Sequence, residues 1–187
     1  MNSNNSPEKN GYIVKVLEEH LTTLCTSKGV LDGELYVVEE LEDVWTKCAP
    51  EYMVDAVPEI AKYPTVAIAW AAYFGLGIAS LWDANWDTHK ESENLYKFIR
   101  DKRGFDCMDE YVTEELVATT AKDGKLLADL IGDCSTLALT LIRKENIEAQ
   151  SVEAFYLFAD FTKVFFKLGV SLELYRLGYK YQKMIFS

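Results

Sequence analysis

One stretch decides the fold: residues 64–82 read PTVAIAWAAYFGLGIASLW, from Pro64 to Trp82. The stretch contains no charged residue, and proline is favoured at the first position of a helix. A helix that is apolar on all sides either spans a membrane or forms the buried centre of a globular protein. Much of this run is alanine and glycine, and no cluster of lysine or arginine marks one end. We therefore expect a central buried helix over about 64–84 and no membrane partner.

Small residues recur every fourth position along this helix, at Ala67, Ala71, Gly75 and Ala79. A stripe of small side chains allows the axis of another helix to come close. The pattern predicts that a neighbouring helix packs tightly at Gly75.

Apolar residues at helical spacing predict further helices on both sides of the central one. Gly29 and Gly104 are expected to end two of them. We find no alternating apolar and polar stretch long enough for a strand. The prediction is an all-α bundle of six to seven helices. The expected helices cover about 12–28, 32–48, 106–120, 124–144 and 151–183, with short ones after Pro50 and around 95–99.

The length of 187 residues suits a single domain. Residues 1–10 are rich in asparagine and serine and are expected to form a disordered tail, which leaves 11–187 as one helical domain. The start of the chain lacks the apolar run of a signal peptide, so a cytoplasmic location is expected. The four cysteines form no CxxC pair and are interpreted as isolated reduced thiols: Cys25, Cys48, Cys107 and Cys134.

The formal net charge of −11 repels nucleic acid, so no nucleic-acid partner is expected. With only two histidines, the chain offers little to a nucleophilic triad, and it contains no nucleophile elbow, HExxH motif, P-loop or GxGxxG motif. Whether the protein is an enzyme stays open at this point.

The central helix is followed by the segment WDANWDTH, from Trp82 to His89. Asp83 and Asp87 are four residues apart and would share a helical face, where like charges repel. One interpretation is a divalent cation held by Asp83, Asp87 and His89, since oxygen ligands with one imidazole suit Mg, Mn or Fe. The other is that the helix ends near Asp83, with Asn85, Asp87 or Thr88 capping the next helix, or that a carboxylate accepts from a Trp indole or pairs with a nearby arginine.

A candidate binding surface combines Trp82 and Trp86 with the basic residues Arg100 and Arg103. The basic segment 97–103 would suit an anionic ligand or an acidic partner. Alternatively, acidic and basic helices pack side by side and neutralise each other.

Glu39 and Glu42 form an ExxE pair, and Asp129 and Asp133 lie four apart on a later helix. This arrangement is similar in form to the all-helical nucleotide pyrophosphohydrolases of the MazG and dUTPase type, which hold Mg with ExxE and ExxD pairs. The second pair departs from that pattern, because its acids are four rather than three apart. Acidic residues on one helix face are also typical of a solvated surface.

The last predicted helix carries an aromatic and leucine seam with alternating steps of three and four residues. Such a seam packs either in the core of a bundle or against another copy of the chain, which would make helix 151–184 the interface of a homo-oligomer. Its members are Phe158, Phe161, Phe165, Leu168, Leu172, Tyr175 and Tyr179.

These observations leave three functional hypotheses. The leading one is a non-enzymatic protein-interaction or oligomerising module, since no strong catalytic motif is present. The alternatives are a metal-dependent hydrolase that uses helix carboxylates, and a binder of a small apolar or aromatic ligand.

Overall fold

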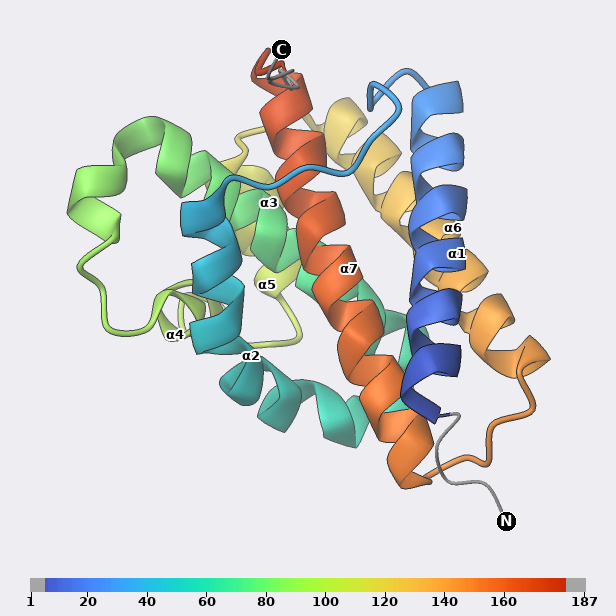
Figure 1. Ribbon diagram of the computed structural model, residues 1–187. Coiled ribbons are helices and arrows are strands. Elements are labelled where there is room, and N and C mark those ends of the chain that lie inside the picture. The colour runs from blue at the N-terminus through green and yellow to red at the C-terminus, as the bar shows by residue number, and fades with distance from the viewer. Residues whose placement is uncertain (1–5, 181–187) are drawn as a thin grey trace, which may run out of the picture.

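The computed structural model describes residues 6–180 and contains seven α-helices and no strand within that range (Figure 1). The prediction of an all-α bundle is confirmed. The helices are α1 (Ser6–Ser27), α2 (Glu39–Ile60), α3 (Pro64–His89), α4 (Leu95–Arg100), α5 (Met108–Tyr111), α6 (Ala121–Lys144) and α7 (Val152–Arg176), with a π-helical turn η1 (Val112–Leu116) after α5.

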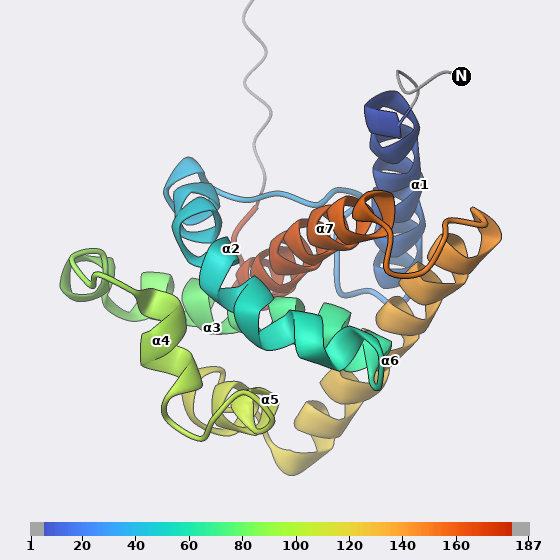
Figure 2. The same ribbon diagram turned by 90° about the horizontal axis from the view of Figure 1, so that it is seen from below.

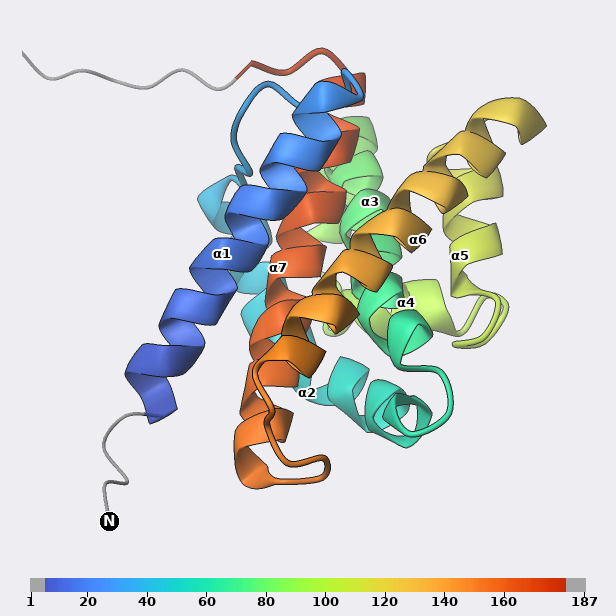
Figure 3. The ribbon, with the colours of Figure 1, turned by 90° about the vertical axis from the view of Figure 1, so that its right-hand side faces the viewer.

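The bundle is built around α3 and α7, which make the most extensive contact in the molecule. Helices α1 and α6 lie on one side of this pair, and α2 and α4 lie on the other (Figures 1 and 2). Figure 3 shows α3 and α7 rising together between α1 and α6. Every residue of α3 from Ala67 to Leu81 except Trp70 is buried, so the uncharged stretch forms the centre as predicted.

Two glycines allow α3 and α7 to touch through their backbones. A Cβ atom added at Gly75 would lie 2.2 Å from the carbonyl oxygen of Phe166, and one added at Gly169 would lie 1.9 Å from that of Ala72. Both distances are far below van der Waals contact, so neither position accepts a side chain without moving a helix. The expected close packing at Gly75 is confirmed, and Gly169 provides the matching small residue on α7.

By length and composition alone, α3 could also cross a membrane. In the structure, 72% of its most apolar window is buried by other helices of the same chain. A helix of this kind needs no lipid to cover its apolar surface.

The first segment that differs from the prediction is the N-terminus. Helix α1 begins at Ser6, so residues 6–10 are helical rather than part of a tail, whereas 1–5 lie outside the described residues. Pro7 near the start and Glu8 in the first turn both favour a helix N-terminus. Asn10 is 6% exposed, which shows that this turn packs against the rest of the protein.

The second difference lies between α1 and α2, where residues 34–38 are extended instead of helical. This segment crosses over α7 (Figure 1). The Ser171 hydroxyl fastens it, because it accepts from the Tyr36 backbone N–H at 2.9 Å and lies 2.7 Å from the Tyr36 carbonyl oxygen. We call residues 34–38 the strap.

Helix α2 continues through Pro50 and Pro58 instead of stopping before a separate short helix. Each proline removes one backbone hydrogen bond and favours a bend, and α2 changes direction along its length in Figures 1 and 2. Its apolar face still packs as one surface, with Trp45 and Tyr52 buried on both sides of Pro50.

The expected helix over 106–120 is instead α5 followed by η1, and the chain turns at Ala118, whose φ is 53°. The last helix ends at Arg176 with Gly178 in the left-handed region at φ 90°, and 181–187 lie outside the described residues. The seam of α7 is buried in the chain's own core from Phe158 to Leu172, whereas Tyr175 and Tyr179 are exposed.

Candidate functional site

The C-terminal part of α3 bends at Asn85, whose φ of −169° and ψ of 83° are not helical. The Asn85 side-chain oxygen accepts from the Thr88 backbone N–H at 3.3 Å and so caps the turn that follows. This confirms the interpretation in which the first helix ends near Asp83 and Asn85 caps the next one. The bend takes Asp83 and Asp87 out of a common helical register.

Asp83 and Trp82 belong to a cluster that joins α2, α3 and the end of α7. The Tyr179 hydroxyl donates to Asp83 at 2.6 Å, which raises the pKa of Tyr179. The Tyr179 ring lies 5.3 Å from that of Trp82, edge to face. The Trp82 indole N–H donates to Glu40 at 3.1 Å. The predicted hydrogen bond between a tryptophan indole and a carboxylate is therefore present, but the carboxylate belongs to α2 rather than to the segment that follows the central helix.

The cation ligands expected from the sequence do not form one set. Asp83 accepts from Tyr179, Asp87 pairs with Lys90 at 2.5 Å, and the His89 ring packs 5.9 Å from that of Phe98. Lys90 also lowers the pKa of Asp87 through this hydrogen bond. Within residues 6–180, no three histidine, cysteine, aspartate or glutamate side chains are grouped so that they could hold a metal ion.

Two hollows lie beside this cluster. The larger, of about 700 Å³, lies between the strap and the end of α7 and is lined by Asp32, Gly33, Glu34, Tyr36, Tyr175, Gly178, Tyr179 and Lys180. The smaller, of about 190 Å³, lies between α2 and the end of α3, and Trp86 and Glu40 are among its lining residues. Trp82 contacts Glu40 on one side and Tyr179 on the other, so it connects the walls of both hollows.

The walls of the larger hollow are held firmly. The Tyr36 hydroxyl donates to the Tyr179 carbonyl at 3.2 Å, and its backbone is fastened to Ser171. Burial, followed by the nearby charge of Asp32, raises the pKa of Tyr36. A recess with three tyrosines and fixed walls suits a flat aromatic ligand better than it suits hydrolytic chemistry.

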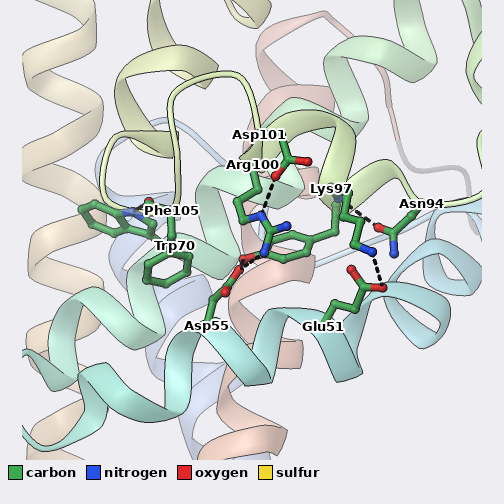
Figure 4. A network of polar contacts seen from close by, with 9 residues as sticks. Glu51, Asp55, Trp70, Asn94, Lys97, Arg100, Asp101 and Phe105 are labelled. Atoms are coloured by element: carbon green, nitrogen blue, oxygen red, sulfur yellow. Dashed lines mark hydrogen bonds and ion pairs between the residues drawn. The ribbon is translucent and has the colours of Figure 1, made fainter.

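The predicted binding arginines lie elsewhere, around α4, and both are occupied by carboxylates of the chain. Arg100 pairs with Asp55 at 2.9 Å and with Asp101 at 2.8 Å (Figure 4). Arg103 pairs with Glu114 at 2.7 Å and with Glu115 at 2.9 Å. The interpretation in which basic and acidic elements neutralise each other describes this region. Among residues 6–180, no hydrogen bond or ion pair joins Trp82 or Trp86 to either arginine.

Figure 4 shows how α4 is fastened to α2. Asp55 accepts from Arg100 and, at 2.6 Å, from the hydroxyl of the fully buried Tyr96. Burial and then this hydrogen bond raise the pKa of Tyr96. Lys97 lies 3.6 Å from Glu51 of α2. Asp55, Tyr96 and Arg100 are paired with one another, so the network is suited to holding helices together.

One buried carboxylate is not among the functional residues predicted from the sequence. Glu173 of α7 is 1% exposed and accepts from Ser80 of α3 at 2.8 Å and twice from Arg176 at 2.7 Å. Its position between Leu172 and Leu174 gave a signal, because a charge inside an apolar run on a core helix needs a partner. Arg176 at i+3 provides that partner, so the group locks the ends of α3 and α7 instead of facing a ligand.

The carboxylates compared with the pyrophosphohydrolases do not meet in a common site. Glu39 and Glu42 begin α2, whereas Asp129 and Asp133 belong to α6 on the other side of the central pair (Figure 1). Asp133 is occupied by Lys28 at 3.3 Å.

A cluster of exposed apolar side chains occupies the end of the molecule where α7 begins. Val152, Phe155 and Tyr156 share one face of the first turns of α7 and are 73%, 43% and 60% exposed. The second half of α2 reaches the same end (Figures 1 and 2) and carries the exposed Val54 and Val57, and the exposed Tyr63 follows in the turn before α3. We call these six residues the apolar end.

The two halves of the apolar end belong to helices that cross nearby. The Thr162 hydroxyl of α7 lies 3.7 Å from the sulfur of Met53 in α2. From this point, Val57 is one turn further along α2 and Phe155 is two turns earlier on α7. Because the two helices run in opposite directions (Figure 1), both steps lead toward the same end of the molecule.

These features define an all-α protein with a tightly packed centre, an aromatic recess beside the end of α7 and an apolar end. No known protein family, curated protein or solved structure matches this chain. Proposals about its function therefore depend on its own residues.

Proposed function

We propose that this protein is a non-enzymatic interaction module that associates with a second copy of itself through the apolar end. The observation that carries the proposal is the exposure of six large apolar side chains on α2, α7 and the turn before α3. Scattered exposed apolar residues are normal, but a gathered set marks an interaction surface.

The size of the apolar end supports a second copy as the partner. From their exposed fractions, the six side chains present on the order of 500 Å². The largest apolar patch on a typical monomer is about 300–600 Å², and a standard interface buries about 800 Å² per partner. With its polar rim included, the apolar end therefore has the dimensions of one side of a symmetric dimer.

The start of α7 relates this proposal to the oligomer interface that the seam predicted. The seam residues from Phe158 to Leu172 are used inside the chain, so they leave no surface for another copy. The same helix leaves Val152, Phe155 and Tyr156 uncovered one to two turns earlier. Helix α7 would thus contribute to an oligomer through its first turns.

Molar mass as a function of concentration tests the proposal. Light scattering on the full chain should show a rise from 21.3 kDa toward twice that mass. Because the net charge of −11 repels another copy, association should strengthen with added salt. A mass that stays at 21.3 kDa up to millimolar chain concentration in high salt would contradict the proposal.

A pair of matched variants assigns the interface. Tyr156→Ser combined with Val54→Ser should abolish the rise in mass, since both residues are mostly exposed and neither belongs to the buried core. Leu126→Ser is the control, because Leu126 is 58% exposed at the start of α6, away from the apolar end. If the double variant and Leu126→Ser lose the rise in mass equally, or if neither loses it, the apolar end is not the interface.

The larger hollow favours a second candidate function, the binding of a small aromatic ligand. Its volume of about 700 Å³ lies within the range of ~300–1,000 Å³ found for ligand pockets. Ligand-observed NMR with indole and phenol as probes should show contact that Tyr175→Ala weakens. Contact that this variant leaves unchanged would assign the probes to another surface.

A further inference from the structure

Two of the four cysteines meet in the core, where α1 packs on α6. The sulfur atoms of Cys25 and Cys134 lie 3.9 Å apart, although the residues are 109 positions apart in the sequence. Both side chains are fully buried, and all four cysteines are free thiols. No sequence pattern indicates this pair, because its spacing fits no motif.

The two thiols point toward each other across the helix interface. A contact of 3.9 Å is a sulfur–sulfur hydrogen bond, which requires both side chains to be directed at a common point. A disulfide needs about 2.05 Å between the sulfur atoms, so the pair must close by roughly 2 Å. Cys25 lies in the last turn of α1, next to the turn at Lys28 and Gly29, where a helix end can shift most easily.

The surroundings also hold these two helix segments in register. Lys28 and Asp133, the near neighbours of Cys25 and Cys134 in sequence, form an ion pair at 3.3 Å between the same elements. Among residues 6–180, neither Cys48 nor Cys107 forms a sulfur–sulfur contact of this kind.

We propose that Cys25 and Cys134 are a redox-sensitive thiol pair, which hydrogen peroxide converts to a disulfide that joins α1 to α6. The Cys25 thiolate attacks one peroxide oxygen, the O–O bond breaks, and the released hydroxide takes up a proton to leave as water. This forms sulfenic acid on Cys25. The Cys134 sulfur then attacks the Cys25 sulfur, the S–O bond breaks, and the second water leaves with the Cys134 proton. Two thiols and one peroxide thus give one disulfide and two waters.

The hydrogen bond between the thiols decides which sulfur reacts first. Either sulfur can be the donor in this contact, which lowers the pKa of Cys25, and Lys28 lowers it further against the effect of burial. The same contact raises the pKa of Cys134. The thiolate, which is the attacking species, therefore forms on Cys25.

Burial of the two sulfurs limits the rate of oxidation, and the disulfide that forms stabilises the folded protein. Because both sulfurs are inaccessible in the closed structure, peroxide must enter when the end of α1 separates from α6, so local opening limits the rate. Once formed, the bond closes a loop of more than one hundred residues, which restricts the unfolded chain. The oxidised protein should melt about 5–10 °C higher than the reduced one.

The experiment exposes the full chain to hydrogen peroxide and determines its mass and its linked peptides. The expected result is the loss of two hydrogen atoms from the whole protein and a Cys25–Cys134 peptide pair that a reductant separates. Cys48→Ser should behave like the wild type, whereas Cys134→Ser should lose the linkage and the rise in melting temperature. The wild-type peptide map alone decides the linkage if Cys134→Ser does not fold.

The proposal is overturned if peroxide oxidises the folded chain at Cys107 or elsewhere while Cys25 and Cys134 remain separate thiols. It is also overturned if the linkage appears only in the presence of denaturant. This inference does not rest on self-association, since the pair lies in the interior between α1 and α6. Its failure would leave the molar-mass experiment unaffected.

Discussion

The crossing of α3 and α7 and the junction of α4 with its neighbours use opposite means of holding helices together. At the crossing, Gly75 and Gly169 remove side chains so that backbones touch, and almost everything nearby is apolar. Around α4, Arg100 and Arg103 reach across gaps to carboxylates. Close packing tolerates no added volume, whereas an ion-paired junction tolerates volume but depends on charge and salt. The two regions should therefore fail under different perturbations.

The largest effect is expected for Gly169→Ala. The added Cβ would lie 1.9 Å from the Ala72 carbonyl oxygen, a backbone atom that cannot move without α3. We expect a loss of about 3 kcal/mol or more in the free energy of unfolding, measured with urea, at the upper end of what overpacking costs. Gly75→Leu should be at least as damaging, because its first atom meets the Phe166 carbonyl oxygen at 2.2 Å.

The control for this experiment is Gly132→Ala. Gly132 is an exposed residue within α6, and an added Cβ meets no atom within 4 Å. Alanine is the better helix former by about 1 kcal/mol, so this variant should be stabilised. If the two alanine variants changed stability equally, the close approach of α3 and α7 would be refuted.

The next effect concerns Asp55→Ala at the junction of α2 and α4. This change leaves the buried Tyr96 hydroxyl and the Arg100 guanidinium without their shared acceptor. An unsatisfied buried donor costs roughly 1–3 kcal/mol, so a loss of about 2 kcal/mol is expected from urea unfolding. Asp101→Ala removes the exposed partner of the same arginine and should cost far less. If Asp101→Ala lowered the free energy of unfolding more than Asp55→Ala does, Asp55 would not be the main acceptor in this network.

The sequence predicted the central crossing well because the signal was local. Nineteen residues without charge and small residues every fourth position indicate one buried helix and one contact stripe, whichever helix is the partner. The identity of that partner was not local. Gly169 lies within the last predicted helix, but its contact with Ala72 depends on residues about one hundred positions apart.

For the junctions around α4, the sequence predicted the type of interaction but not the residues that pair. The sequence indicated that basic segment 97–103 either binds an anion or is neutralised, and the structure shows Arg100 and Arg103 neutralised. Asn85 as a cap was also among the alternatives. The strap was missed because residues 34–38 fall within the predicted helix over about 32–48. Their extended conformation depends on a hydrogen bond with Ser171, which is far away in the sequence. The contact of Cys25 with Cys134 was equally beyond a local pattern.

A smaller effect is expected for Arg103→Gln, on the outer side of the α4 junction. Arg103 pairs with Glu114 and Glu115, and all three side chains are partly exposed. Exposed ion pairs contribute little and are screened by salt. The variant should melt slightly below the wild type in dilute buffer and together with it in molar salt. A deficit that persists in molar salt would show that Arg103 stabilises through packing instead of charge.

The smallest effect, which is a gain rather than a loss of stability, concerns Asp109 of α5. This carboxylate is half-buried, burial raises its pKa, and among residues 6–180 no ion pair involves it. A carboxyl group with a raised pKa in the folded state contributes stability below its unfolded pKa, and that contribution is lost as the pH rises through the folded value. Asp109→Asn should therefore melt above the wild type at neutral pH, and the difference should disappear in acid once Asp109 is protonated. Asp106→Asn, which changes an exposed acid three residues earlier, is the control for the loss of one negative charge. If Asp109→Asn raised the melting temperature by the same amount at every pH, the cost of Asp109 would be steric rather than electrostatic. The junctions around α4 would then follow the same packing rule as the central crossing.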